Sequence, residues 1–206
     1  MMRKITWIAA VAVILIAGAR IVRPTAPEIR NADPLGTTLI AFGDSLTYGT
    51  GAGPGRDYPT RLSELLGLPV VNAGVPGDTT ASALRRLAAD VLTRSPRIVF
   101  ITLGGNDLKN GVSREAAFGN LREIIEGIQA EGALVVLAGI DIPFWGRGFA
   151  QAYRDLARET GAVLIPDIFD GIIGDRRLMS DSIHPNAAGY ALMAEKFHEA
   201  VRPYVR

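Results

Sequence analysis

Short apolar segments alternate with amphipathic segments along most of this chain, and that alternation constrains the fold more than any other feature. The apolar runs are continuous rather than alternating with polar residues, which is typical of strands buried on both faces of a parallel sheet. Four of them are clear and a fifth is weaker: Thr38–Phe42, Val70–Ala73, Ile98–Leu103, Leu134–Ala138 and, last, Ala162–Ile165.

The segments between these runs carry apolar residues three or four positions apart, the spacing of a helix with one buried face. They cover Pro59–Leu66, Thr80–Arg94, Ser113–Ala130, Gly148–Thr160 and Asn186–Val201. Repeated strand-then-helix order predicts an α/β fold, a three-layer α/β/α sandwich with right-handed crossovers. The chain shows no internal repeat and no sign of a second domain.

The first 35 residues differ in character from the rest. Two basic residues within Met1–Lys4 precede Ile5–Ala19, which has no charge. Residues 1–22 are therefore predicted to be a signal peptide or an N-terminal membrane anchor, with export to the periplasm or the extracellular space. Ala17-Gly18-Ala19 fits a signal-peptide cleavage site, but the arginines that follow slightly favour an uncleaved anchor. A buried helix of the domain is the third interpretation. Residues 23–35, with three prolines, predict a linker, and the domain is expected over 36–206.

Composition excludes several classes of function. Lys and Arg number 22 against 21 Asp and Glu, so no basic excess points to nucleic acid. Cysteine is absent, which excludes disulfides, a thiol nucleophile and cysteine metal sites. With only two histidines, fourteen positions apart, we expect no metal site. The glycine-rich stretch over 49–55 misses the spacing of a dinucleotide-binding loop.

Polar and glycine residues gather just after three of the predicted strands. The segments are Gly43-Asp44-Ser45-Leu46, Asn72-Ala73-Gly74 and Gly104-Gly105-Asn106-Asp107. Ligands of open α/β sheets bind beyond the carboxyl ends of the strands, so these residues are candidates for a site. They would supply a hydroxyl, a backbone N–H without a side chain beside it, and an amide. Taken singly, each segment also fits an ordinary turn or helix cap, and we interpret Asp44 and Asp107 as structural hydrogen-bonding residues.

One histidine is well placed to act as a base. His184 follows Asp181 by three positions and precedes Pro185, which discourages helix at the histidine and suits the first turn of the helix after it. A short turn could bring the Asp181 carboxylate to the ring Nδ1 and leave Nε2 facing outward. Helix capping is the alternative interpretation of Asp181. His198 lies inside the last predicted helix and is interpreted as a surface residue.

The three segments after the strands and the segment from Asp181 to Pro185, in this order, resemble the SGNH (GDSL-type) hydrolase family. The likeness is nearest to its thioesterase I/lysophospholipase and arylesterase branch. Gly77-Asp78-Thr79-Thr80 belongs to the same likeness, which runs from about Thr38 to Arg202. The resemblance implies a flavodoxin-like fold with a five-stranded parallel sheet. It also implies an activity that requires no metal or organic cofactor. It also implies the roles of the site residues: Ser45 as nucleophile, His184 as base, Asp181 as orienting acid, and an oxyanion hole formed by the N–H groups of Ser45 and Gly74 and the side-chain amide of Asn106.

The resemblance implies a serine esterase that acts on small-molecule acyl esters or lipids through an acyl-enzyme. Lysophospholipids, acyl thioesters and aryl or alkyl esters are the substrates it suggests. An O-acetyl esterase of carbohydrate or cell-wall polymer is the enzymatic alternative, and a non-catalytic binding module is the other class. Phe144, Trp145 and Phe149 follow the fourth strand, where they could line an acyl site or simply pack onto the domain.

Overall fold

The computed structural model describes residues 28–142, 146 and 148–205. Its centre is a five-stranded parallel sheet with strand order β2-β1-β3-β4-β5. This is the flavodoxin-like order, as expected. All five predicted apolar runs are strands: β1 (Thr38–Gly43), β2 (Val70–Gly74), β3 (Pro96–Thr102), β4 (Leu134–Ala138) and β5 (Val163–Ile165).

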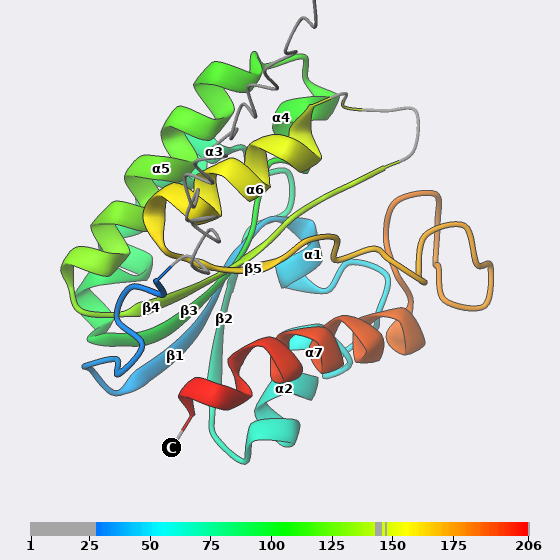
Figure 1. Cartoon of the computed structure of the whole chain (residues 1–206). Coiled ribbons are helices and arrows are strands. Elements are labelled where there is room, and N and C mark those ends of the chain that lie inside the picture. Colours follow the sequence, from blue (N-terminus) through cyan, green and yellow to red (C-terminus); the bar gives the residue numbers. More distant parts are fainter. Residues whose placement is uncertain (1–27, 143–145, 147, 206) are drawn as a thin grey trace, which may run out of the picture.

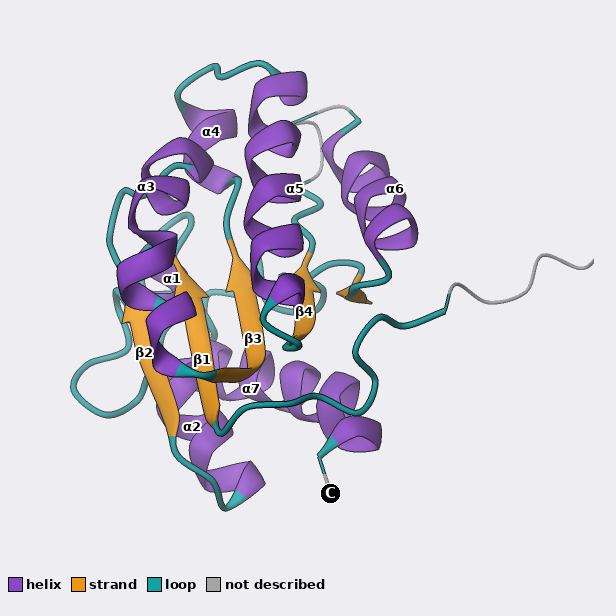
Figure 2. Cartoon of the chain, turned by 90° about the vertical axis from the view of Figure 1, so that its left-hand side faces the viewer, coloured by secondary structure: helices purple, strands orange, loops and turns teal. Residues whose placement is uncertain are grey.

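Helices cover both faces of the sheet and complete the three layers. On one side lie α3 (Thr80–Asp90), α5 (Arg114–Ala130) and α6 (Phe149–Thr160), and on the other α2 (Tyr58–Leu66) packs against α7 (Ala187–Val201), as Figure 1 and Figure 2 show. Two short helices, α1 (Ser45–Tyr48) and α4 (Gly105–Lys109), follow the carboxyl ends of β1 and β3. Short 3₁₀ turns cover Leu92–Arg94 and Arg202–Tyr204.

The core lies between the sheet and these helices. Every residue of β4 is buried, and so are nearly all residues of β3. This burial explains why the two strands are continuously apolar. On the α2–α7 side, the ring of Phe197 stacks on Tyr58 at 4.8 Å between centroids and meets Phe100 edge-on at 5.5 Å. These aromatic contacts fix the α2–α7 pair to the centre of the sheet.

One predicted helix is shorter than its apolar pattern. The pattern ran from Thr80 to Arg94, but α3 ends at Asp90 and the chain then forms a 3₁₀ turn. Ser95 has a φ of +51° and precedes Pro96, the first residue of β3. A residue before proline is disfavoured in the right-handed helical region, so the helical stretch cannot continue through Ser95 into the strand.

The packed part of the chain begins upstream of the predicted start at Gly36. The Arg30 N–H donates to Gly161 O at 2.9 Å, and the Leu35 N–H donates to Gly132 O at 3.1 Å. The Asn31 amide donates to both Gln129 O and Ala133 O at 2.9 Å. Residues 28–35, predicted as linker, thus lie against the domain. The predicted signal or anchor, 1–22, lies outside the described residues; within them, no helix combines the length and apolarity that a membrane span requires.

Candidate active site

The candidate site lies where the carboxyl ends of β1, β2 and β3 meet. Ser45 is the first residue of α1, directly after β1, and Asn106 lies in the first turn of α4, after β3. His184 comes from the loop before α7, far away in sequence. The fold brings the His184 Nε2 atom to 3.1 Å from the Ser45 hydroxyl oxygen, so these two predicted residues are direct neighbours.

Asp181 orients the imidazole of His184. Its Oδ2 atom lies 2.7 Å from the ring Nδ1, and its Oδ1 atom accepts the N–H groups of Ile183 and His184, both at 2.8 Å. The Ile183 N–H and then the His184 ring hold the pKa of Asp181 at about 2, so the group is a carboxylate at neutral pH. A carboxylate only accepts hydrogen bonds, so Nδ1 carries the proton and Nε2 presents its lone pair to Ser45.

Backbone contacts hold the loop that carries the histidine. The Ser180 N–H and hydroxyl both donate to His184 O, at 2.9 and 3.0 Å, and Met179 forms an antiparallel bridge with Pro185. Asn186 then caps α7, since its side-chain oxygen accepts from the Ala188 N–H. The imidazole is therefore positioned by a closed turn anchored to the start of a helix.

Asp44 supports the segment that carries Ser45 from within the core. Its Oδ1 atom accepts the Leu46 N–H at 3.0 Å, which caps α1. Burial raises the pKa of Asp44 to about 7, against the lowering effect of the Leu46 N–H. Across the described residues we find no acceptor for the Ser45 N–H, so it is free to bind a substrate oxygen.

The Asn106 amide lies between two segments of the site. Its Nδ2 atom donates to Asp78 O at 2.9 Å, and it lies 3.3 Å from Asp44 Oδ2. The first contact ties the amide to the loop after β2, and the second is long enough to be exchanged for a better acceptor. Asp107, beside it, accepts the N–H and hydroxyl of Thr80 at 2.9 and 2.7 Å, the structural role expected of it.

Gly74 is not placed as the sequence suggested. Its N–H donates to the Asn72 side-chain oxygen at 3.0 Å, so it is already occupied. A Cβ atom at this position would lie 2.2 Å from the Tyr48 backbone nitrogen and 2.6 Å from the Thr47 carbonyl carbon. The glycine is required because the end of β2 and the backbone of α1 touch, and the expected role as an oxyanion donor does not fit this geometry.

A glycine three residues further on, in the loop after β2, has the free N–H. Gly77 lies in a turn closed by the Asp78 N–H donating to Val75 O at 3.1 Å, and it has a φ of +83° after Pro76, as in a type II turn. It is exposed, and its N–H meets no acceptor among the described residues. The next residue, Asp78, binds the Asn106 amide. The Pro76-Gly77 pair is a sequence signal for this turn.

A small apolar cavity of about 50 Å³ adjoins Ser45 and His184. Its apolar lining comes from five residues, and one lysine lies at its edge: Leu46, Ile140, Ile142, Phe169, Ile183 and Lys109. Of the aromatic residues considered for this role, Phe144 and Trp145 lie outside the described residues. Phe149 is buried against Phe118, with ring centroids 5.4 Å apart, so it packs α6 onto α5.

No cluster of three or more acidic or histidine side chains suited to a metal ion occurs within residues 28–142 and 148–205. A hydroxyl, an imidazole held by a carboxylate, free or exchangeable N–H donors and an apolar cavity are the components of acyl transfer.

Comparison with known proteins agrees with this chemistry. A family model described as GDSL-like Lipase/Acylhydrolase matches residues 41–192. Esterase TesA of Pseudomonas aeruginosa is 31% identical over 81% of this chain and 88% of its own length. Thioesterase 1/protease 1/lysophospholipase L1 of Escherichia coli is 31% identical over 82% of this chain and 85% of its own length.

The fold agrees as well. A crystal structure of TesA superimposes with a TM-score of 0.77 at 31% identity, covering 82% of this chain and 99% of the other. The structural neighbours of this chain include further SGNH hydrolases, which share the flavodoxin-like α/β/α fold. The family match, the identity and the fold coincide on one domain: the chain belongs to the GDSL-like lipase/acylhydrolase family and is a hydrolase of ester bonds.

Proposed function

We propose that this hydrolase cleaves acyl esters through a covalent acyl-enzyme on Ser45, with His184 as general base and Asp181 as the orienting acid. The observation that carries the proposal is the continuous contact from Asp181 Oδ2 to the His184 ring (2.7 Å) and on to the Ser45 hydroxyl (3.1 Å). A base within hydrogen-bond reach of a serine, itself oriented by a third group, is the arrangement that activates a nucleophile.

In the proposed reaction, the Ser45 oxygen attacks the ester carbonyl while its proton passes to His184 Nε2. The oxyanion is bound by the N–H groups of Ser45 and Gly77 and by the Asn106 amide, which exchanges its 3.3 Å contact with Asp44 for the charged oxygen. His184 then protonates the leaving alcohol, and water attacks the acyl-enzyme by the same route. Gly77 replaces Gly74 in this assignment because the N–H of Gly74 is occupied.

The cavity beside Ser45 favours short acyl groups. Its volume of about 50 Å³ is several times the roughly 10–15 Å³ that one water molecule needs on the same measure, so it accommodates the first carbons of an acyl chain. Leu46, Ile140 and Phe169 give it an apolar lining suited to those carbons. Acetyl to butyryl esters are the expected substrates, with small acyl thioesters as a second leaving-group class, since one relative is named a thioesterase.

The test uses p-nitrophenyl esters from acetate to palmitate, with Ser45→Ala assayed in parallel. We expect acetate and butyrate to be hydrolysed fastest, and we expect Ser45→Ala to lose at least about 10³-fold in kcat. Equal activity in Ser45→Ala would remove the serine from the mechanism. A palmitate rate above the butyrate rate would contradict the short-acyl assignment and favour a lysophospholipid, which the same assay can include as lysophosphatidylcholine.

A cavity of this size also suits an O-acetyl group on a carbohydrate. This second candidate predicts release of acetate from acetylated xylan or peptidoglycan at a kcat/KM above that for p-nitrophenyl acetate. Acetate release from neither polymer would remove it.

The N-terminal segment supports a proposal about location. Because residues 5–19 lack charge and follow two basic residues, we propose that the protein is exported and held at the membrane by this segment. Cell fractionation with an antibody to the folded domain tests this, since a protein found wholly in the cytosol would contradict it.

A further inference from the structure

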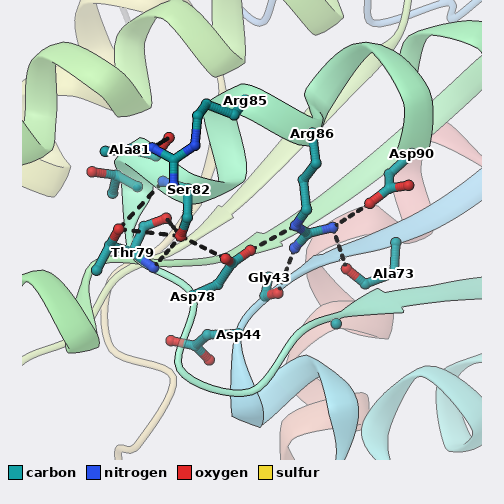
Figure 3. A network of polar contacts seen from close by, with 12 residues as sticks. Gly43, Asp44, Ala73, Asp78, Thr79, Ala81, Ser82, Arg85, Arg86 and Asp90 are labelled. Atoms are coloured by element: carbon teal, nitrogen blue, oxygen red, sulfur yellow. Dashed lines mark hydrogen bonds and ion pairs between the residues drawn. The ribbon is translucent and has the colours of Figure 1, made fainter.

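One guanidinium joins the two strand ends that support the site (Figure 3). The Arg86 side chain, from α3, donates through Nη2 to Gly43 O at 2.9 Å and through Nη1 to Ala73 O at 3.0 Å. Its Nε atom donates to Asp78 Oδ2 at 2.6 Å, and Nη1 also reaches Asp90 Oδ2 at 2.8 Å. The last residue of β1, the end of β2 and the loop after β2 are thus tied to a single planar group.

These contacts are largely shielded from water. The side chains of Arg86 and Asp78 are 17% and 7% exposed, and the guanidinium lies 4.3 Å from the centre of the Phe42 ring. Charge-assisted bonds in such surroundings are stronger and more directional than those on the surface. Only arginine offers donors in a fixed planar fork that can meet two carbonyls and two carboxylates together.

Two of the groups that Arg86 holds, Gly43 O and the Asp78 carboxylate, belong to the segments that carry the proposed oxyanion donors. Gly43 O is two residues before Ser45, and it also accepts the Val75 N–H at 3.0 Å. Asp78 follows Gly77, and its backbone oxygen accepts the Asn106 amide. The Asp78 carboxylate is held from its other side by the Ser82 hydroxyl at 2.5 Å. Arg86 therefore links the nucleophile segment to the turn that carries Gly77 and orients Asn106.

We propose that Arg86 is a positioning residue for the oxyanion hole, fixing the distance between the Ser45 N–H and the Gly77–Asn106 pair. The inference rests on the proposed function and extends it to a residue that does not touch substrate. Oxyanion donors act within a narrow range of distances, and a misplacement of about 1 Å can lower the rate about 10²-fold. The acyl cavity is lined by other residues, none of which bonds to Arg86, so substrate binding should change little.

The experiment compares Arg86→Met and Arg86→Lys with Arg85→Met in the full chain. Arg85 is the matched control because it is the neighbouring arginine on the same helix, is exposed, and donates to Ala81 O within α3. For p-nitrophenyl acetate, we expect Arg86→Met to lower kcat about 10²-fold with KM changed less than about threefold. Arg86→Lys should restore part of the loss, and Arg85→Met should match the wild type.

Asp78→Asn provides a second route if Arg86→Met does not fold. It keeps the size of the side chain and removes the charge that binds Arg86 Nε, so kcat should fall with KM retained. The double variant Asp78→Asn/Arg86→Lys should lose less than the product of the two single losses, since both break the same link.

Several results would overturn the inference. A folded Arg86→Met with wild-type kcat would do so, as would a loss confined to KM, an equal loss in Arg85→Met, or fully multiplicative losses in the double variant. Ser45→Ala is run beside these variants. If Ser45→Ala retains activity, the proposed function fails and the inference fails with it; if activity depends on Ser45 but not on Arg86, only the inference fails.

Discussion

At the residue scale, the charge of Asp181 controls which nitrogen of His184 can accept a proton. An asparagine at position 181 keeps the shape but can turn its amide towards Nδ1, which moves the ring proton to Nε2 and blocks the base. We expect Asp181→Asn to lower kcat about 10³–10⁴-fold at pH 7. Steady-state hydrolysis of p-nitrophenyl acetate measures this. Ser182→Ala, an exposed neighbour on the same loop, is the control and should retain wild-type kcat.

Asp44 makes a different residue-scale prediction, one about stability. Burial raises its pKa from 3.8 to about 7, so between these values the folded protein keeps a proton that the unfolded chain releases. The free energy of unfolding should therefore fall as the pH rises from about 4 to about 7, by up to about 1.4 kcal/mol for each pH unit from this group. Asp44→Asn should remove that slope in urea unfolding measured at several pH values.

The control for Asp44 is a carboxylate with the opposite shift. Asp175 is exposed, and its hydrogen bonds with Arg177 hold its pKa at about 2, so it is charged in both states over the same interval. Asp175→Asn should leave the slope unchanged. Equal slopes in the wild type and Asp44→Asn would show that Asp44 is ionised in the folded protein.

At the element scale, two glycines at and just beyond the carboxyl end of β2 should respond differently to alanine. In Gly74→Ala the new Cβ would meet the backbone of α1 at 2.2 Å, which no side-chain movement relieves, so α1 must separate from β2. We expect a loss of more than about 3 kcal/mol in the free energy of unfolding. In Gly77→Ala the new Cβ has open space around it, and the strained φ is the one cost. We expect this variant to lose about 1–2 kcal/mol in the free energy of unfolding.

Thermal or urea unfolding of the two variants measures the difference. Gly67→Ala is a control for the strain alone, because Gly67 also has a positive φ and open surroundings. It should behave like Gly77→Ala. A Gly74→Ala protein as stable as Gly77→Ala would mean that the contact between α1 and β2 is not tight.

The same two glycines show how far the sequence could go. Five strands were predictable because continuous apolarity marks burial on both faces, and Asp181 with His184 was predictable because three positions suit one turn. Gly74 ends β2 and Gly77 lies in the loop after it, and only the backbone geometry decides which N–H is free. The helices α1 and α4 are too short to show a period. The contacts of Arg86 join three separate segments, so no spacing along the chain could have indicated them.

At the scale of the whole molecule, residues 28–35 pack at the amino ends of the strands, whereas the site lies at their carboxyl ends. Their hydrogen bonds reach Gln129 O in the last turn of α5, Gly161 O after α6, and two carbonyls just before β4, Gly132 O and Ala133 O. At about 0.5 kcal/mol each, the low end of the net contribution of a hydrogen bond, four such bonds contribute about 2 kcal/mol to the free energy of unfolding.

A chain that begins at Gly36 should therefore unfold about 4–8 °C below a chain that begins at Glu28. Asn31→Ala in the longer chain removes two of the four bonds and should lower Tm by about half as much. Since Ser45 and His184 lie at the carboxyl edge of the sheet, kcat below the unfolding transition should be equal in all three proteins. Equal Tm values would mean that the segment contributes no net stability, and a lower kcat in the shorter chain would mean that it reaches the site through the sheet.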